Sequence, residues 1–592
     1  MQQATPSPIP DMMPAAARPS PRVWPGALLV ILMWLAIKVP GWVAPGTIVQ
    51  FMAMMWGPLA GAALILAWWI FASRFSWAVR LVGLLSMIVG LAAAFMVGHP
   101  SMRMGFIVFG VPVSVTALVV AAVIGSFLGN RSASLLVPIA VLGVWAFLAC
   151  LRLDGLDGSI NSSVSFRWTP TAEDRYLAAR AKQVTQQASS LPATLPGALL
   201  LSDGDWPGFR GAGRDSKLAG VRISTNWNEQ PPKQLWRHLI GPGWSSCCII
   251  GDRLFTQEQR GVDEVVVCDD TSTGQELWAH SDRARFAEAM GGAGPRATPT
   301  FAGGKLYTLG ASGILNCLNP LTGKVIWMRN IGTDAAAPTP MWGFASSPLV
   351  FGGLVTVITG GAGKSVMAYD AATGAPAWAA GDGWSYASTQ VSRVAGVDSL
   401  LLVTARGASA FDPINGQFLW QHDFPIGSAN RCVQPTLVSD NQFLLGAAFG
   451  IGTRRVSVTH NGGTWKSQAD WTTRKLKPYY NDMVFHKGHI YGFDGSSVVC
   501  FDPESAESNW RANGYGNGQV LLLTDSDLLL ILSEQGVAAL VEARPDAYRE
   551  AGRFQAINGK TWNHPVIAHG KLFVRNGEEI ACYQLVDASQ RG

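Results

Sequence analysis

Eight short loops between residues 243 and 566 combine aromatic, amide, hydroxyl and guanidinium side chains, which is the chemistry of a binding site. Their candidate ligand-binding residues are Trp244, Arg296, Trp384, Arg431, Asn481 and Asn563. An indole face can stack on a planar ligand, and a guanidinium group can pair with its carboxylates. The same residues can instead pack against neighbouring elements of the fold and hold water in a channel. Both interpretations place these loops at a shared centre.

Acidic residues are scarce in these loops. Asp482 is the one acid that they contain, and Glu258 and Glu534 lie further along the chain, where nothing in the sequence directs them to the same place. A calcium ion prefers several carboxylate or carbonyl oxygens. We therefore predict no metal site.

Two adjacent cysteines, Cys247 and Cys248, follow the first loop. Vicinal cysteines can form a redox-active disulfide, or they can be small packing residues. Here they fall at the start of an expected strand, where alternation directs the two side chains to opposite faces and disfavours a bond between them. Four other cysteines share one repeat position with alanines, which indicates small, buried and unpaired residues; they are Cys268, Cys317, Cys500 and Cys582.

A repeat positions the eight loops. Each copy joins an apolar run, an Asp or Asn, a tight turn and a short strand that ends on a marker residue; the markers are Trp236, Trp278, Trp327, Trp378, Trp420, Trp465, Trp510 and Phe554. In the clearest copies a glycine at 274, 323, 374 or 416 suits a turn position with positive φ. The intervals of 42 to 51 residues predict four-stranded propeller blades, and eight markers predict eight blades. The C-terminal strands would close the ring by completing the blade of Trp236.

The N-terminal quarter has a different composition. Five apolar windows, each long enough to cross a bilayer, precede the repeats, at 23–43, 48–72, 77–98, 104–128 and 133–151. The arginines favour a cytoplasmic tail over 1–22 and a C-terminal part outside the cytoplasm. Because the windows contain almost no ionisable residue, we interpret them as an anchor and not as a transport pathway. The fold class is thus an all-α membrane domain of about five helices followed by an all-β eight-bladed propeller over 201–586.

A polar linker at 152–200 joins the two parts, and 587–592 form a short tail. Thr171 and Asp174 have the spacing of a capping box, so a short surface helix is expected to begin there. The net charge of +5 includes no basic run, and we expect no nucleic-acid partner.

The repeated D-x-x-T-G-x-x-x-W turn resembles the tryptophan-docking motif of the PQQ-type (pyrroloquinoline quinone) eight-bladed propellers. That family includes quinoprotein alcohol and glucose dehydrogenases and the non-enzymatic outer-membrane assembly factor BamB. The segment DWPGFRGAGRDS at 205–216 is similar to the leader of single-domain members. The resemblance covers about residues 203 to 586 and concerns the fold more than the chemistry. The layout also resembles membrane-bound quinoprotein glucose dehydrogenases, which have five spans before a periplasmic propeller.

The resemblance implies two alternative functions for a protein of the bacterial inner membrane with its propeller in the periplasm. The first is a binding or scaffold module, anchored in membrane lipid, that recognises an envelope protein or a small-molecule ligand; the minimal blades and missing carboxylates favour it. The second is a dehydrogenase that uses PQQ with Ca²⁺ to oxidise an alcohol or sugar and passes electrons to membrane quinone, since no C-x-x-C-H haem motif occurs. In that case Asp482 would be the base. Arg296 and Arg431 would bind the cofactor carboxylates, and Trp244 or Trp384 would stack on its ring.

Overall fold

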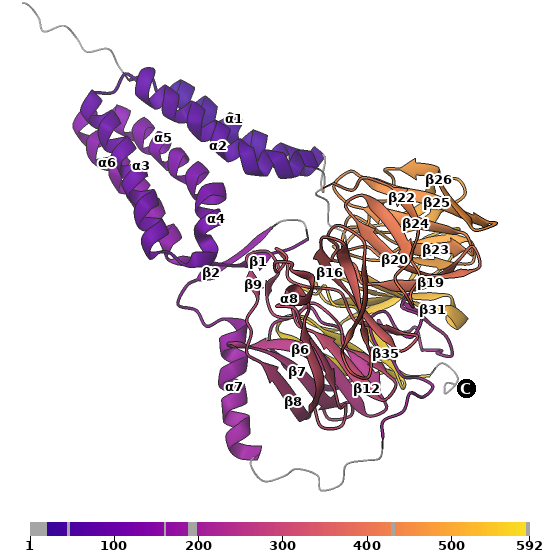
Figure 1. Cartoon of the computed structure of the whole chain (residues 1–592). Coiled ribbons are helices and arrows are strands. Elements are labelled where there is room, and N and C mark those ends of the chain that lie inside the picture. Colours follow the sequence, from indigo (N-terminus) through magenta and orange to yellow (C-terminus); the bar gives the residue numbers. More distant parts are fainter. Residues whose placement is uncertain (1–20, 44–47, 159–160, 188–197, 428–431, 588–592) are drawn as a thin grey trace, which may run out of the picture. The chain divides into compact units, whose positions relative to one another are not determined.

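The computed structural model describes residues 21–43, 48–158, 161–187, 198–427 and 432–587 (Figure 1). The chain divides into two compact units, which we call the helical unit and the propeller unit. The helical unit comprises Met1–Leu153 with Val164–Arg167, and the propeller unit comprises Asp154–Ser163 with Trp168–Gly592. Residues 154–163 of the expected linker therefore belong to the propeller unit.

The helical unit contains five helices that are long and apolar enough to cross a membrane, as the sequence predicts. Its elements are α1 (Trp24–Val43), α2 (Ile48–Phe71), α3 (Trp77–Val97), η1 (Pro100–Met102), α4 (Arg103–Gly105), η2 (Phe106–Gly110), α5 (Val111–Leu128) and α6 (Asn130–Ala149). The fourth span is continuous from Pro100 to Leu128 and includes the π-helical turn η2. A Cβ atom on Gly90 would lie 2.3 Å from the Trp145 ring, so this glycine lets α3 pack closely on α6.

Two elements follow the last span. A two-stranded sheet of β1 (Leu151–Leu156) and β2 (Ser162–Phe166) precedes α7 (Ala172–Gln187). The expected capping box is present, because the Thr171 N–H donates to Asp174 and the Asp174 N–H donates to the Thr171 hydroxyl, at 2.8 and 2.9 Å. The Tyr176 hydroxyl donates to Glu258 at 2.6 Å, so α7 packs on the side of the first blade instead of standing free.

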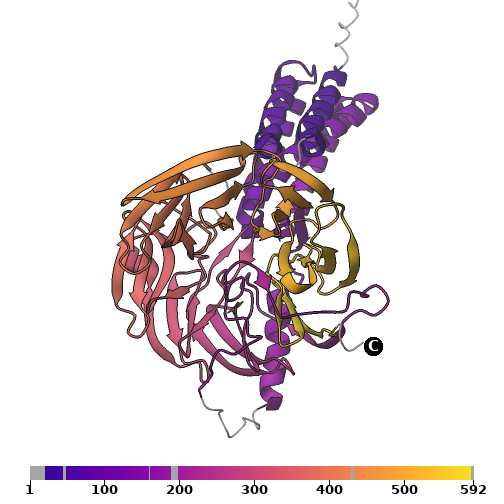
Figure 2. The same cartoon turned by 90° about the vertical axis from the view of Figure 1, so that its right-hand side faces the viewer.

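Eight sheets form the propeller in the described part of the chain, which confirms the predicted architecture (Figure 2). Blade 1 is β5 (Cys248–Ile250), β6 (Arg253–Arg260), β7 (Asp263–Asp270) and β8 (Glu276–Asp282); blade 2 is β11 (Thr300–Ala302), β12 (Lys305–Leu309), β13 (Ile314–Leu318) and β14 (Val325–Asn330). Blade 3 is β15 (Leu349–Phe351), β16 (Leu354–Gly361), β17 (Lys364–Asp370) and β18 (Pro376–Ala380); blade 4 is β19 (Gln390–Val394), β20 (Val397–Thr404), β21 (Gly407–Phe411) and β22 (Phe418–Asp423).

The remaining blades complete the ring. Blade 5 is β23 (Thr436–Ser439), β24 (Gln442–Ala447), β25 (Gly452–Asn461) and β26 (Thr464–Thr473); blade 6 is β27 (Val484–His486), β28 (His489–Asp494), β29 (Ser497–Asp502) and β30 (Glu507–Ala512). Blade 7 is β31 (Gln519–Leu523), β32 (Leu528–Leu532), β33 (Val537–Glu542) and β34 (Glu550–Gln555), with β3 (Lys217–Leu218) added parallel to β31. Blade 8 is β35 (Val566–Ala568), β36 (Lys571–Arg575), β37 (Glu579–Gln584) and β4 (Lys233–Leu239), so the two ends of the repeat share a blade as predicted.

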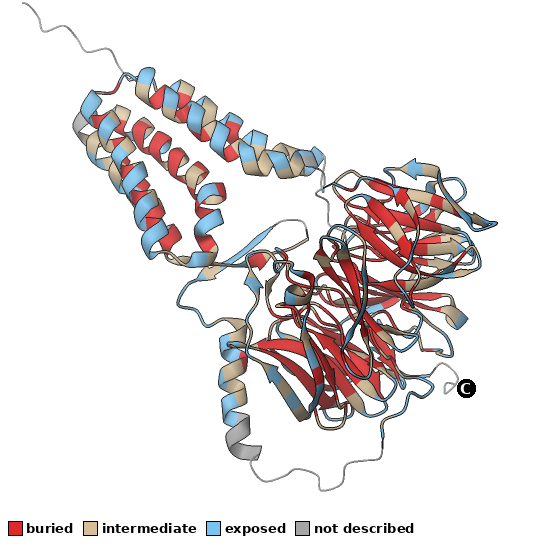
Figure 3. Ribbon diagram, viewed as in Figure 1, coloured by how far each residue is buried: buried red, intermediate tan, exposed pale blue. Residues whose placement is uncertain are grey.

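A bulge between the third and fourth strands fixes the position of each blade's marker residue. In blade 1 the residue before this bulge, Cys268, pairs with Trp278, and the same register pairs the other three core cysteines with Trp327, Trp510 and Trp236. These cysteines are fully buried and free, which confirms their interpretation as packing residues. Buried residues run through the strands of the propeller (Figure 3).

Two predicted markers were wrong. In blade 5 the residue before the bulge pairs with Trp471 and not with Trp465, which stacks on His460 at the end of the long β25–β26 hairpin. In blade 7 the equivalent position is Gly552 and not Phe554. Trp227, which precedes β4 in the chain, occupies the space beside it, since a Cβ on Gly552 would lie 3.1 Å from the Trp227 Cβ. Spacing alone favoured Trp465 and Phe554 because each is an aromatic residue close in sequence to the residue that pairs at the bulge.

The marker tryptophans join neighbouring blades. The indole N–H groups of Trp236, Trp278 and Trp471 donate to carbonyls in the turn of the following blade, at 3.0, 3.0 and 2.9 Å. The turn glycine lies beneath the same ring. A Cβ on Gly274, whose φ is 70°, would come within 2.7 Å of Trp236, so this position needs glycine for both its conformation and its contact.

Candidate functional site

A ring of polar residues surrounds the propeller axis, two positions before each innermost strand. Its members are Ser246, Thr298, Ser347, Ser388, Gln434, Asp482, Asn517 and His564. From blade 1 onward, backbone N–H groups donate to the side chain at the same position of the next blade. Ser246 donates to Thr298 at 3.0 Å, Thr298 to Ser347 at 3.0 Å, and Ser347 to Ser388 at 2.9 Å. Hydrogen bonds between successive blades therefore hold these loops in place.

Asp482 is the last acceptor in this series. One carboxylate oxygen accepts the Gln434 N–H at 2.7 Å, and the other lies 3.3 Å from Nε of Arg210. Burial raises the pKa of Asp482, while the Arg210 charge and the Gln434 N–H oppose that shift. The carboxylate of this candidate base is thus occupied by two protein donors. Its proposed catalytic role stays a prediction.

The leader at 205–216 fills the channel beside the ring. Trp206 bridges to Ile249 of β5, and the Arg214 guanidinium donates to the carbonyls of Ser347 and Pro348 at 3.0 and 2.9 Å. Burial lowers the pKa of Arg214 to about 9. Burial and the nearby Arg210 lower the pKa of His564 to about 3, so this imidazole is neutral under ordinary conditions. The sequence likeness of the leader gave no sign that it enters the channel.

Next to the ring, five side chains gather in what we call the mouth cluster: Trp244, Tyr480, Glu534, Lys560 and Trp562. The rings of Trp244 and Trp562 have centroids 4.7 Å apart, and the Lys560 ammonium lies 5.2 and 4.4 Å from those two centroids. Burial lowers the pKa of Lys560 to about 8, although neighbouring carboxylates favour its charge. The cluster joins aromatic faces, one cation and one buried carboxylate.

Residues 154–158 of the propeller unit occupy this cluster. The Lys560 ammonium donates to the Leu156 carbonyl at 2.9 Å, and the Gly158 N–H donates to Glu534 at 2.6 Å. The Leu156 N–H donates to the Met290 carbonyl at 3.2 Å, in the loop between β9 (Ala287–Glu288) and β10 (Gly292–Ala293). Every one of these bonds uses a main-chain atom of the segment.

Glu534 is the centre of the mouth cluster. Besides the Gly158 N–H, its carboxylate accepts the indole N–H of Trp562 at 2.8 Å, the Tyr480 hydroxyl at 3.3 Å and the Asn517 N–H at 3.1 Å. The side chain is 2% exposed. Its sequence position beyond the loops gave no reason to expect it here, and Lys560, one residue outside the loop TWNHPV, was missed for the same reason.

The other predicted site residues are not members of the mouth cluster. Arg296 pairs with Glu288 at 3.1 Å and donates to the carbonyls of Gly292 and Trp342, while burial lowers its pKa to about 10. Trp384 packs against Phe344, with centroids 6.1 Å apart.

The two predicted asparagines hold backbone, because Asn481 donates to the Gly518 carbonyl at 3.3 Å and Asn563 to the Ser245 carbonyl at 2.6 Å. Glu258 accepts from Tyr176 of α7, away from the mouth cluster. Arg431 lies outside the described residues.

The residues present do not fit a quinone cofactor held by calcium. Within the described ranges no group of three or more His, Cys, Asp and Glu side chains could hold a metal ion. Of the candidate groups for the cofactor carboxylates, Arg296 is already bound to Glu288 and to backbone carbonyls. We derive no reaction through such a cofactor.

Cys247 and Cys248 are both free thiols. Cys247 packs in the cluster that joins blades 7 and 8 to blade 1, whereas Cys248 packs between blades 1 and 2. Burial raises the pKa of Cys247 to about 12 and raises that of Cys248 further. The predicted strand alternation thus separates them, and they remain packing residues.

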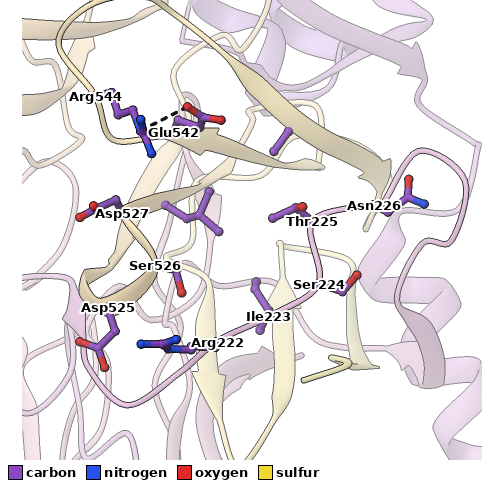
Figure 4. A pocket seen from close by; sticks show the side chains of 12 residues that line it. Arg222, Ile223, Ser224, Thr225, Asn226, Asp525, Ser526, Asp527, Glu542 and Arg544 are labelled. Atoms are coloured by element: carbon purple, nitrogen blue, oxygen red, sulfur yellow. Dashed lines mark ion pairs between the residues drawn. The ribbon is translucent and has the colours of Figure 1, made fainter. Parts of the chain in front are cut away.

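A surface cleft of about 510 Å³ lies between residues 222–226 and blade 7, lined by residues that include Arg222, Asn226, Asp525, Glu542 and Arg544 (Figure 4). Its charges are mixed and partly paired, since Arg544 lies 3.5 Å from Glu542. The cleft contains none of the residues predicted from the loops.

The comparisons with known proteins concern the propeller. A family model described as "Outer membrane protein assembly factor BamB" matches residues 262–512. Among solved structures, BamB from Moraxella catarrhalis is 16% identical, with a TM-score of 0.41, over 60% of this chain and 97% of that chain. A quinohemoprotein alcohol dehydrogenase from Comamonas testosteroni is 13% identical, with a TM-score of 0.46, over 69% and 84%. No curated protein matches the sequence.

Proposed function

We propose that this protein is a membrane-anchored binding module whose ligand site is the mouth cluster, and not a quinoprotein dehydrogenase. One observation carries the proposal: Glu534 and Lys560 bind main-chain atoms of a peptide segment, residues 156–158. The groups that a catalytic site would need are engaged elsewhere, because Asp482 is bound by Arg210 and Arg296 by Glu288. The mouth cluster therefore supports binding of another molecule more directly than catalysis of a reaction on that molecule.

The experiment that separates the two functions uses the purified full-length protein in detergent. PQQ and Ca²⁺ are added, and bound quinone is measured by its absorbance after gel filtration, with dye reduction assayed over a panel of alcohols and sugars. We expect no retained quinone and no substrate-dependent dye reduction. Retained quinone together with dye reduction would establish the dehydrogenase instead.

We further propose that the five helices anchor the protein in a bacterial inner membrane and that the propeller lies in the periplasm. The excess of arginine on the N-terminal side of the helices supports this orientation. The test is a C-terminal fusion to alkaline phosphatase, which is active only outside the cytoplasm, compared with a fusion to a fluorescent protein that matures only inside. We expect an active phosphatase. A fluorescent fusion with an inactive phosphatase would reverse the orientation.

A further inference from the structure

The segment at 154–158 has the features of a replaceable ligand. Three hydrogen bonds to the propeller use the backbone of Leu156 and Gly158. It belongs to a sheet of only two strands, β1 and β2, and such hairpins are marginally stable alone. Leu156, Asp157 and Gly158 are half-buried. The segment can therefore leave the mouth cluster without opening a blade.

The contact also selects for glycine. A Cβ atom on Gly158 would lie 2.3 Å from the Asn517 amide nitrogen and 2.7 Å from the Tyr480 hydroxyl. The Tyr480 ring is held against Trp562 and its hydroxyl donates to Glu534, while the main-chain N–H of Asn517 donates to the same carboxylate. Any side chain at this point would thus displace part of the mouth cluster.

Departure of the segment leaves groups that need new partners. Glu534 loses one of its N–H donors, and Lys560 loses a carbonyl acceptor beside two indole rings. Buried charges without partners are costly, so an occupant that restores both bonds is favoured. Such an occupant presents a carbonyl, an N–H group two residues later, and glycine at that second residue.

We propose that the mouth cluster recognises a glycine-containing peptide turn of a partner protein, and that residues 156–158 are the internal ligand that this turn displaces. The proposal rests on the proposed binding function and names its ligand class. Recognition through the main chain makes the glycine and the turn the determinants, with little demand on the neighbouring side chains. The segment that connects the two units of the chain is then also the competitor for the site.

The test measures binding of a fluorescent synthetic peptide with the sequence of residues 152–163 to the full-length protein in detergent, by fluorescence anisotropy. Gly158→Val removes the internal ligand from the protein. Ser163→Val, an exposed position of the same hairpin, is the matched control. Because a tethered competitor acts at high effective concentration, we expect the peptide to bind G158V at least about tenfold more tightly than the wild type or the control.

Two further measurements define the contact. A peptide with valine in place of its Gly158 should bind G158V at least about tenfold more weakly, and Glu534→Gln in the G158V background should weaken binding by about tenfold or more. If G158V does not fold, Leu156→Pro replaces it, since it removes the N–H that donates to Met290. Equal binding by wild type and variant, or binding indifferent to the peptide glycine, would overturn the proposal. Uptake of PQQ would instead contradict the proposed function and leave the peptide result standing.

Discussion

Nε of Arg210 lies 3.3 Å from the Asp482 carboxylate, and both side chains are almost wholly buried, at 3% and 4% exposure. Arg210 comes from the leader and Asp482 from the loop before blade 6. The pair therefore fixes the leader inside the propeller channel.

Replacing Arg210 with Met should destabilise the propeller, because it leaves Asp482 buried without its partner. Breaking a buried ion pair in this way costs about 3–5 kcal/mol. The measurement is the thermal unfolding midpoint of the propeller, with Arg222→Met, at an exposed position after the leader, as the control. The double variant R210M/D482N should recover much of the loss. A double variant as unstable as R210M alone would show that the pair is not the cause.

Trp471, and not Trp465, should support the contact between blades 5 and 6. Trp471→Ala removes an indole that packs on Phe501 and donates to the Pro503 carbonyl, and the expected cost is about 3 kcal/mol. Trp465→Ala, six residues earlier in the same strand, loses a cross-strand stack on His460 and a partly buried contact at the edge of the core of blades 4 and 5, and should cost less, about 1 kcal/mol. Chemical denaturation of the two variants checks the difference, and equal losses would contradict the register of blade 5.

Lys560 should make the propeller relatively more stable as the pH rises above 8. Its pKa is about 8 in the folded protein and 10.5 ordinarily, so between these values the unfolded chain holds a proton that the folded chain has released. The groups that face it are Glu288, Glu534, Asp157 and Arg296. The unfolding midpoint of the wild type should rise relative to Lys560→Met by about 1–2 °C per pH unit in this window. A constant difference between the two proteins would exclude this effect.

His564 should make the propeller sensitive to acid. The pKa of His564 is about 3 in the folded protein and 6.5 ordinarily. Between these values the unfolded chain therefore binds a proton that the folded chain does not bind. The free energy of unfolding should fall by about 1.4 kcal/mol per pH unit from this group as the pH decreases from 6 toward 4. His564→Gln should lose that part of the slope. An unchanged slope in the variant would show that this imidazole is not the group responsible.

The thiols should be reduced and mostly unreactive. Six cysteines, including Cys247 and Cys248, are buried free thiols. A thiol titration of the folded protein with a disulfide reagent should label at most Cys150 and Cys432, and denaturation without reductant should expose eight thiols. A count of six after denaturation would reveal one disulfide, which peptide mapping would assign.

The propeller could be predicted from the sequence because its signals are local. A turn glycine such as Gly274 and the tryptophan of the preceding blade repeat at intervals of 42 to 51 residues, the length of one four-stranded blade. The mouth cluster could not be predicted in the same way. The cluster brings together residues that are far apart in the sequence, since Gly158 lies several hundred residues before Glu534 and Lys560. They meet only because the ring closes and residues 154–158 pack against it. Trp465 and Phe554 failed as markers because only backbone register distinguishes them from their neighbours.

The sharing of blade 8 between both ends of the repeat also has a consequence for biosynthesis. Strand β4 is synthesised near the start of the propeller. Its partner β37 is synthesised more than three hundred residues later. Until then β4 is an unpaired edge, and the leader has no channel to enter. Unpaired edges promote aggregation of incomplete chains, and long-range closure is slow. The exposed edge of β4 therefore has to be kept from pairing with other chains during nearly the whole synthesis of the propeller.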